Sequence, residues 1–183
     1  YTHENIGYGP VTLPDQEMHT TACWWQLPEP VLHSLFENRQ QALDGFLGAA
    51  HALHVVARIA VMADGADLQK AVGSGDGAWS ASGDGRGRGQ LRATDGAAVQ
   101  ADALARFEPT VYLYDNYPGG VGLSEPLFQR QAELLQRAQS LVEACDCRAG
   151  CPGCVGPVLD ESVPLAEGPR QLVLRLLRAL QAA

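Results

Sequence analysis

The sequence predicts an α+β fold in which a small mixed sheet is packed by long helices and a four-cysteine knuckle lies near the C-terminal end. Three observations lead to this expectation. Residues 110–115 form a β-branched and aromatic run typical of a strand, residues 31–62 carry apolar side chains at helical spacing, and four cysteines lie within residues 145–154. The 183 residues can bury a real core and are expected to form a single domain, residues 1–183.

The N-terminal part of the chain predicts one strand followed by a helical region. Residues 18–26 are rich in threonine and aromatic side chains, which suits a half-buried strand that two prolines then end. The apolar residues from Val31 to Met62 recur at helical spacing and predict one long helix or a bent pair. Gly45 and Gly48 are candidate weak points of that helix.

A glycine-rich stretch follows. Seven of the eighteen residues from Gly73 to Gln90 are glycine, and the few apolar groups there cannot offset the entropy lost on ordering. We therefore expect residues 72–106 to form a flexible insertion, and we interpret its Arg-Gly-Arg-Gly piece as part of a solvated loop.

The C-terminal part of the chain predicts a strand and two helices. The strand at residues 110–115 ends at the turn signal Asn116 to Gly120. A helix then follows with Ser124 as candidate N-cap and runs to Cys145, and a last amphipathic helix spans Pro169 to Gln181.

Charge and composition exclude several classes of protein. The formal net charge is -8, from 13 basic and 21 acidic residues, and Lys70 is the one lysine in the sequence. A protein that binds DNA mainly by neutralising phosphates needs clustered positive charge, so any DNA contact here is expected to be local and auxiliary. No apolar run approaches the roughly eighteen residues that span a bilayer. The chain begins at Tyr1, so we expect it to be a piece of a longer protein.

The most specific motif is the set of four cysteines at Cys145, Cys147, Cys151 and Cys154, separated by one, three and two residues. Four soft ligands on a tightly turned backbone suit a tetrahedral ion, and the adjacent glycines and proline allow such turns. Because the protein fills all four positions, the expected ion is one structural Zn²⁺. An iron–sulfur cluster, a redox dithiol at Cys151 and Cys154, and disulfides are the alternatives. Such closely spaced cysteines indicate a reducing, cytoplasmic location.

A second motif follows the strand at residues 110–115. Its glycines Gly119, Gly120 and Gly122 precede a helix, where backbone N–H groups can contact an anion or the DNA backbone. The alternative is a tight turn that packs the helix against the sheet. The sequence contains no phosphate-binding P-loop motif.

Isolated titratable residues suggest a further alternative. Asp115 and the Gly119–Gly120 turn, with His51, define the candidate site of a stand-alone nuclease or phosphohydrolase. His51 and His54 lie one helical turn apart, but such histidines are more often packing residues. Cys23 is expected to be a buried small hydrophobic residue.

Residues 110–157, together with the EMHTTACWW segment at 17–25 and the His-Ala-Leu segment at 51–53, resemble a known family. The resemblance is to the C-terminal zinc-binding domain of large superfamily 2 DNA helicases, the mitomycin repair factor A and RecQ-like group of DEAD/DEAH-box proteins. It implies that the four cysteines are zinc ligands, which their spacing also suggests.

The resemblance further implies a parent protein that hydrolyses ATP with Mg²⁺ and translocates 3′ to 5′ along single-stranded DNA in DNA repair. Its ATPase motifs belong to RecA-like motor domains upstream of this chain, so the chain itself is expected to be a non-catalytic accessory domain. Its expected partners are those motor domains and single-stranded or forked DNA. A protein-interaction module is a further alternative.

Overall fold

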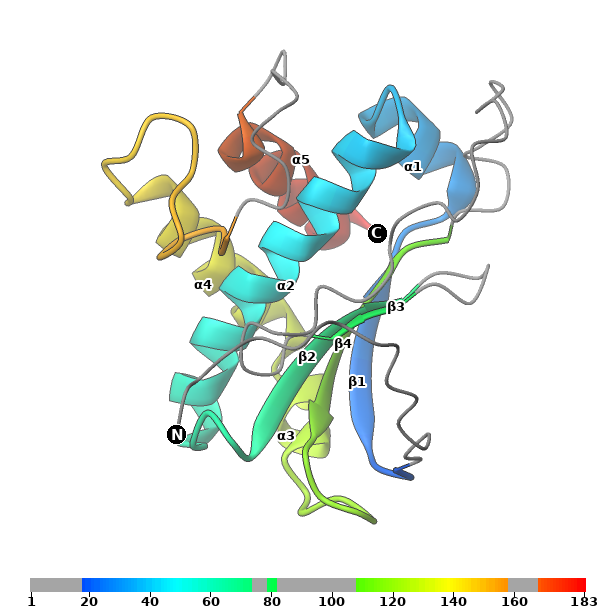
Figure 1. Cartoon of the computed structure of the whole chain (residues 1–183), viewed down its shortest axis with the longest axis vertical. Helices are drawn as coiled ribbons and strands as arrows, with labels where there is room; N and C mark the ends of the chain where they lie inside the picture. The colour runs from blue at the N-terminus through cyan, green and yellow to red at the C-terminus, as the bar shows by residue number, and fades with distance from the viewer. Residues whose placement is uncertain (1–17, 74–78, 82–107, 158–167) are drawn as a thin grey trace, which may run out of the picture.

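A computed structural model describes residues 18–73, 79–81, 108–157 and 168–183. Figure 1 shows a sheet with helices gathered on one side of it, which confirms the predicted α+β class. The described elements are, in chain order, β1 (Ala22–Gln26), α1 (Glu29–Leu35), α2 (Arg39–Val61), β2 (Leu68–Gly73), β3 (Trp79–Ala81), β4 (Thr110–Asp115), α3 (Ser124–Gln129), α4 (Gln131–Glu143) and α5 (Pro169–Ala182).

The sheet has the strand order β1-β4-β2-β3. Every described pairing is antiparallel, so the sheet is not mixed as the sequence suggested. Strand β4 lies centrally: Leu113 pairs with Cys23 of β1 on one side and with Lys70 of β2 on the other. The predicted strand at 110–115 is confirmed, whereas β1 begins four residues later than predicted.

Two strands were missed from the sequence. Strand β2 reads Leu-Gln-Lys-Ala-Val-Gly and carries no strong β signal, and β3 lies within the predicted glycine-rich insertion. Both are specified by pairing with neighbours, which local propensity does not report. Most of the expected insertion, residues 74–78 and 82–107, lies outside the described residues.

The predicted helical region at 31–62 is a pair of helices rather than one. Asn38 starts α2, because its side-chain oxygen accepts the N–H of Gln41 at 2.9 Å. Helix α2 runs without a break through Gly45 and Gly48, and a Cβ at Gly48 would clash with Cγ2 of Val173. These glycines let other elements approach the helix closely.

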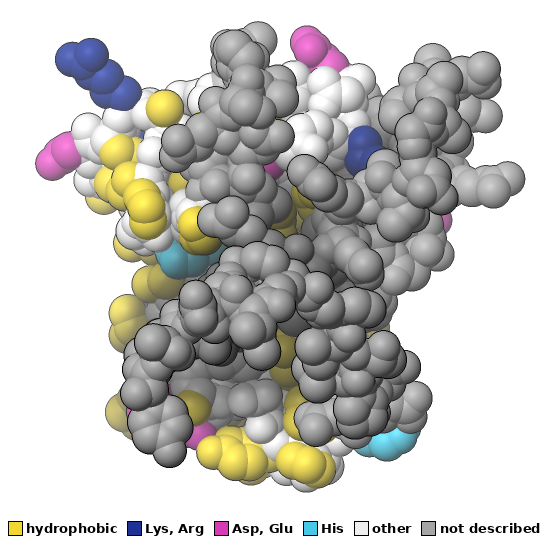
Figure 2. Space-filling model, viewed as in Figure 1, with side chains coloured by type: hydrophobic (Ala, Val, Ile, Leu, Met, Phe, Trp, Pro, Cys, Tyr) yellow, Lys and Arg dark blue, Asp and Glu magenta, His cyan; other side chains and the backbone are white. Residues whose placement is uncertain are grey.

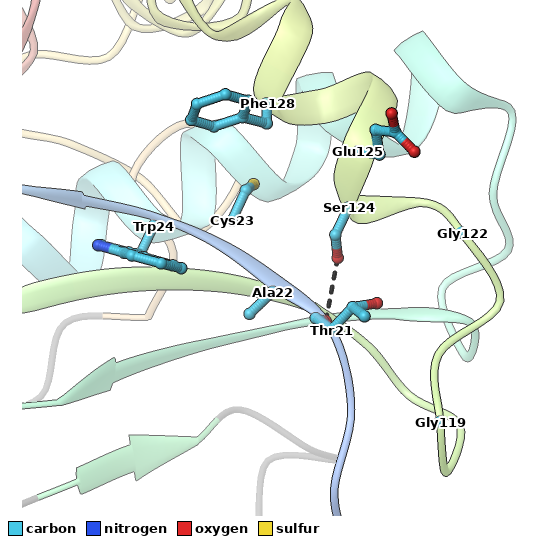
Figure 3. A pocket seen from close by; sticks show the side chains of 9 residues that line it. All are labelled: Thr21, Ala22, Cys23, Trp24, Gly119, Gly122, Ser124, Glu125 and Phe128. Carbon is cyan, nitrogen blue, oxygen red and sulfur yellow. Dashed lines mark hydrogen bonds between the residues drawn. The ribbon is translucent and has the colours of Figure 1, made fainter.

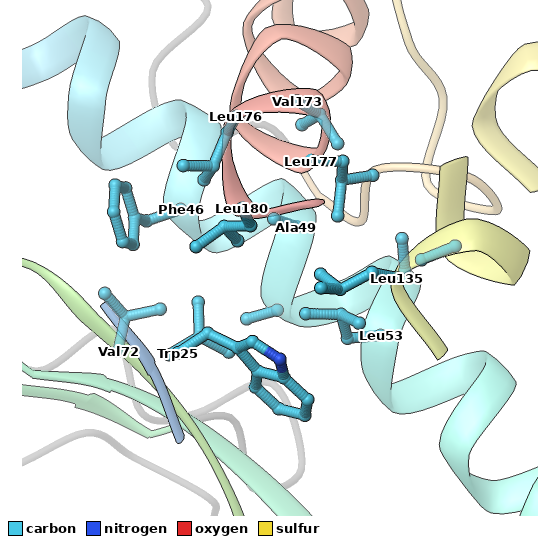
Figure 4. Close-up of a cluster of buried hydrophobic side chains, with 14 of the residues drawn as sticks. Trp25, Phe46, Ala49, Leu53, Val72, Leu135, Val173, Leu176, Leu177 and Leu180 are labelled. Atoms are coloured by element: carbon cyan, nitrogen blue, oxygen red, sulfur yellow. The ribbon is translucent and has the colours of Figure 1, made fainter. Parts of the chain in front are cut away.

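The core lies between the sheet and three helices. Helix α2 packs against β2 and β4 on one side and against α4 and α5 on the other. Figure 4 shows Phe46 and Leu53 of α2 between Trp25 of β1 and the leucines of α5. These side chains are at most 8% exposed, so burial of apolar surface is the main stabilising term.

Charged side chains are scattered over the described part of the face in Figure 2. On the face in Figure 2, the described Lys and Arg side chains stand at separate points and form no continuous basic stripe. Among the described residues, no helix is both long enough and apolar enough to cross a membrane.

Candidate metal centre

The four cysteines lie in the loop that follows α4. Cys145 comes two residues after the end of this helix, and the backbone then turns so that the N–H groups of Cys154 and Val155 both donate to the carbonyl of Cys151, at 3.1 and 3.0 Å. Gly150 has φ +120°, and a Cβ there would lie 2.8 Å from Cγ2 of Val155. Glycine is therefore required at this bend.

The loop brings all four sulfur atoms together. The Sγ atoms of Cys145 and Cys151 are 3.6 Å apart, those of Cys147 and Cys154 are 3.5 Å apart, and all four lie within 4.8 Å of one another. Tetrahedral Zn–S bonds of about 2.3 Å place ligand sulfurs about 3.8 Å apart. The residues therefore fit a single tetrahedral ion.

These distances argue against two of the alternatives, disulfides and a multinuclear iron–sulfur cluster. A disulfide needs an S–S distance of about 2.05 Å, and the cysteines are free thiols. A multinuclear iron–sulfur cluster places several irons and sulfides between its cysteines, which requires wider spacing than this cluster provides.

The electrostatic environment differs between the four thiols. Burial raises the pKa of Cys154 to about 12. Backbone hydrogen bonds from Cys154 and Gly153 lower the pKa of Cys151 to about 7. A cation bound among the sulfurs favours the thiolate form of every ligand and outweighs these differences.

Two residues that the motif does not contain hold this loop against the helices. The guanidinium of Arg170 in α5 donates to the last carbonyls of α4, from Nε to Val142 at 3.1 Å and from Nη2 to Glu143 at 2.9 Å. The Arg170 N–H donates to Ala149 within the loop at 2.9 Å. These contacts fix the direction in which the chain enters the cysteine loop, and no sequence signal pointed to them.

His51 is the second anchor. Its Nε2 donates to the carbonyl of Gly153 at 3.3 Å, and Gly156 packs against its ring. Burial and the charge of Lys70 lower the pKa of His51, whereas the hydrogen bond to Gly153 acts in the opposite direction. His51 thus supports the cysteine loop from α2.

The glycines of the second motif form a closed turn. The N–H groups of Gly119 and Gly120 donate to the carbonyls of His19 and Tyr117, at 2.8 and 2.9 Å, and that of Gly122 donates to Asp115 Oδ2 at 2.8 Å. In this arrangement all three donors are engaged within the chain. Their contact with an anion stays a prediction, and binding would require them to exchange partners.

Asp115 is fully buried beneath this turn. Its Oδ2 accepts N–H groups from Val121, Gly122 and Leu123 at 2.7 to 3.1 Å, and its Oδ1 accepts the hydroxyl of Ser124 at 2.7 Å. Ser124 is therefore not the N-cap that was predicted; Leu123 is the N-cap residue of α3, and the serine hydroxyl instead lies between Asp115 Oδ1 and the carbonyl of Thr21, the residue before β1.

Two other predictions concern buried residues. Cys23 is 3% exposed, and burial raises its pKa to about 12, as expected of a packing residue. His54 is also buried, and its Nε2 donates to the carbonyl of Leu68 at 2.8 Å. Neither side chain joins the cysteine cluster.

The fold and the sulfur cluster together define a small α+β metal-binding domain of the four-thiolate class. The chain belongs to the MrfA Zn-binding domain family, whose model matches residues 49–155. The family resemblance seen in residues 110–157 is thereby confirmed.

Related proteins differ widely in length from this chain. It is 30% identical over 159 residues to the uncharacterized ATP-dependent helicase YprA of Bacillus subtilis (strain 168), a match that covers 87% of this chain and 17% of that protein. It is 33% identical over 52 residues to the uncharacterized protein MJ1572.1 of Methanocaldococcus jannaschii, covering 28% of this chain and 46% of that one.

A solved structure is also similar. The crystal structure of the DUF1998 helicase MrfA bound to DNA matches with a TM-score of 0.56 and 29% identity, over 97% of this chain and 19% of that one. The same helicase bound to DNA and AMPPNP matches with a TM-score of 0.53 and 30% identity. The chain thus spans less than a fifth of these helicases.

Proposed function

We propose that this chain is the zinc-binding domain of an ATP-dependent DNA helicase, and that its four clustered cysteines hold one structural Zn²⁺. The observation that carries the proposal is the convergence of four sulfurs within 4.8 Å in a chain of the MrfA Zn-binding family. Four protein ligands leave no coordination position for a reactive water. The ion would tie the end of α4 to the loop that leads to α5.

Elemental analysis of the purified chain tests the metal. We expect one zinc per chain, and loss of that zinc in Cys154→Ser. The matched control is Cys23→Ser, which removes a buried thiol outside the cluster and should keep one zinc per chain. Iron at the same stoichiometry, with visible absorbance, would falsify the assignment of zinc.

We further propose the role of the parent protein. It would hydrolyse ATP with Mg²⁺ in RecA-like motor domains, translocate 3′ to 5′ on single-stranded DNA in the cytoplasm, and act in DNA repair. Residues 1–183 would form one accessory domain, with residues 72–106 as its insertion, that packs on the motor domains and guides or separates the strands. Similarity to a helicase crystallised with DNA and AMPPNP supports this proposal.

Two experiments test the parent's role. Sequencing the reading frame upstream of the Tyr1 codon should reveal a phosphate-binding G-x-x-x-x-G-K-[ST] loop and a DE-x-H-type box. In the whole protein, replacing Cys151 and Cys154 by serine should reduce unwinding of a 3′-tailed duplex at least tenfold while leaving most DNA-stimulated ATP hydrolysis. Equal loss of both activities would mean that the domain supports the motor rather than strand separation.

A stand-alone hydrolase centred on Asp115 is not supported by the geometry. The carboxylate is fully buried and already accepts four hydrogen bonds, so it is not placed to activate water. The same contacts favour a structural role for this residue.

A further inference from the structure

A hollow of about 610 Å³ lies beside the outer edge of β1, between this strand and α3. Figure 3 shows Trp24 of β1 and Phe128 of α3 on opposite sides of it, with Gly122 and Glu125 at one end. Strand β1 stands at the end of the sheet order, so among the described strands it pairs with β4 alone. We call this hollow the β1–α3 groove.

The register of β1 shows which backbone groups are free to face the groove. Asp115 N–H donates to the Thr21 carbonyl at 3.0 Å, which makes these two residues a hydrogen-bonded pair. Such pairs alternate along an antiparallel ladder, so the backbone N–H and C=O groups of Ala22 and Trp24 point away from β4. Both residues line the groove. Among the described residues no strand pairs with this edge, and an unpaired strand edge is a template for another strand.

The side chains of the groove are unusually apolar for a surface. Trp24 and Phe128 are each 60% exposed, although they belong to different elements and border the same hollow. Paired exposed aromatic side chains mark interaction sites more often than isolated ones do. Their faces also attract cations, arginine above all.

The charge of the groove selects among partners. Glu125 is the charged residue of its lining, and neither Lys nor Arg is among the described residues that border it. The whole chain carries a net charge of -8. A phosphate backbone would meet repulsion here, whereas a basic segment would meet a carboxylate and two aromatic faces.

We propose that the β1–α3 groove binds an extended, basic protein segment that adds to β1 as a further strand and places an arginine or lysine side chain against Trp24, Phe128 and Glu125. Main-chain hydrogen bonds to Ala22 and Trp24 supply the strand pairing, and the aromatic and acidic side chains supply selectivity. This binding activity goes beyond the proposed zinc-binding role, since β1 and α3, which border the groove, lie apart from the loop that follows α4 in Figure 1.

The test uses the zinc-loaded 183-residue chain and a synthetic peptide, acetyl-TVRVRVRVT-amide, with binding followed by calorimetry and by the exchange of amide hydrogens. We expect saturable binding and slower exchange at Ala22 and Trp24. A peptide with glutamate in place of arginine should bind at least tenfold more weakly. Trp24→Ser and Phe128→Ser should each weaken binding at least tenfold, and Glu125→Gln should weaken it several-fold.

Two controls distinguish binding at this groove from nonspecific hydrophobic binding. Ile59 on α2 is 68% exposed, so Ile59→Ser removes an exposed apolar side chain elsewhere and should leave the affinity unchanged. Two N-methylated peptides test strand pairing: one is methylated at every valine and the other at every arginine. Because alternate residues face β1, one of them should lose binding and the other should keep it.

Several results would overturn the proposal. Absence of saturable binding of the arginine peptide, equal affinity of the two N-methylated peptides, or unchanged affinity in both aromatic variants would each exclude strand addition at this groove. Binding of a fluorescein-labelled oligothymidylate that Trp24→Ser abolishes and the arginine peptide does not displace would identify a nucleic-acid surface instead. Circular dichroism and zinc content verify that each variant is folded.

Discussion

The carboxylate of Asp115 closes the turn between β4 and α3, since three consecutive backbone N–H groups converge on its Oδ2. Burial acts to raise the pKa of Asp115, but hydrogen bonds from Ser124 and from the backbone outweigh it and hold the pKa below its usual value. The fold therefore favours the ionised form of the Asp115 carboxyl group. This explains why a strand-end aspartate that looks catalytic in the sequence is structural.

Replacing this residue tests that role. Asp115→Ala leaves three part-buried N–H groups without their acceptor and should lower the free energy of unfolding by about 4 kcal/mol, measured by urea denaturation. Asp64→Ala is the matched control: Asp64 accepts one N–H, from Ala66, in an exposed turn, and its loss should lower stability by about 1 kcal/mol or less. Equal effects of the two substitutions would contradict this interpretation.

His54 gives the domain a pH-dependent stability. Burial lowers the pKa of His54 to about 4, and the charges of Lys70 and Arg58 act in the same direction. The unfolded chain takes up this proton near pH 6.5 but the folded chain only near pH 4, so stability is lost as the pH falls between these values. The loss is at most about 1.4 kcal/mol per pH unit.

The contribution of His54 is measured by comparison. Urea unfolding of the wild type and of His54→Gln between pH 4.5 and 7 should show a smaller slope of stability against pH in the variant. Acid also protonates the cysteines, but that effect is common to both proteins and cancels in the difference. Parallel slopes would show that His54 does not carry the dependence.

Among the helices and strands, local sequence patterns predicted those with a strong periodic signal and missed those that depend on contacts with distant residues. The aromatic run of β4 and the leucines of α5 were read correctly because each carries its own periodic signal. The helix predicted from Ser124 to Cys145 is broken at Arg130, whose guanidinium donates to the Ala60 carbonyl at 2.7 Å. Such a contact spans 70 residues and leaves no local trace.

The junction of α4 and α5 is where the helices support the cysteine loop. Arg170→Ala removes the donors to Val142 and Glu143 and should weaken zinc retention about tenfold, as substitutions around metal ligands commonly do. Transfer of zinc to a chromogenic chelator measures this. Arg178→Ala is the control, because Arg178 contacts Glu143 only through an exposed ion pair. Indistinguishable transfer rates would show that Arg170 does not position the loop.

For the whole molecule, the sequence revealed the metal centre far better than the groove. Four cysteines in ten residues restrict the chemistry by themselves, because few ions other than zinc suit four convergent thiolates. The groove depends on which of two adjacent tryptophans faces outward. A strand must place Trp24 and Trp25 on opposite faces, but only the packing of the helices decides that Trp25 is buried at 5% exposure and Trp24 is not.

The division of the molecule into a large core and a small cysteine loop predicts what metal removal does. The core between α2, α5 and the sheet contains fully buried side chains such as Phe46, Leu53 and Leu113, none of which depends on the ion. The cysteine loop has little apolar surface of its own, because most of it is half-buried or exposed and only Cys154 and Val155 among residues 145–155 are buried in the core. Zinc binding energy is therefore expected to stabilise the loop locally.

Hydrogen exchange before and after chelation measures this directly. Treatment of the zinc-loaded chain with a strong chelator should remove amide protection from residues 145–156 and from the first turn of α5, where the Arg170 N–H donates to Ala149. Protection of β4 should persist, because its partners lie in the sheet and α2. Unchanged protection in the loop would make the metal incidental to the fold, and loss of protection in β4 as well would show that the ion holds the entire domain together.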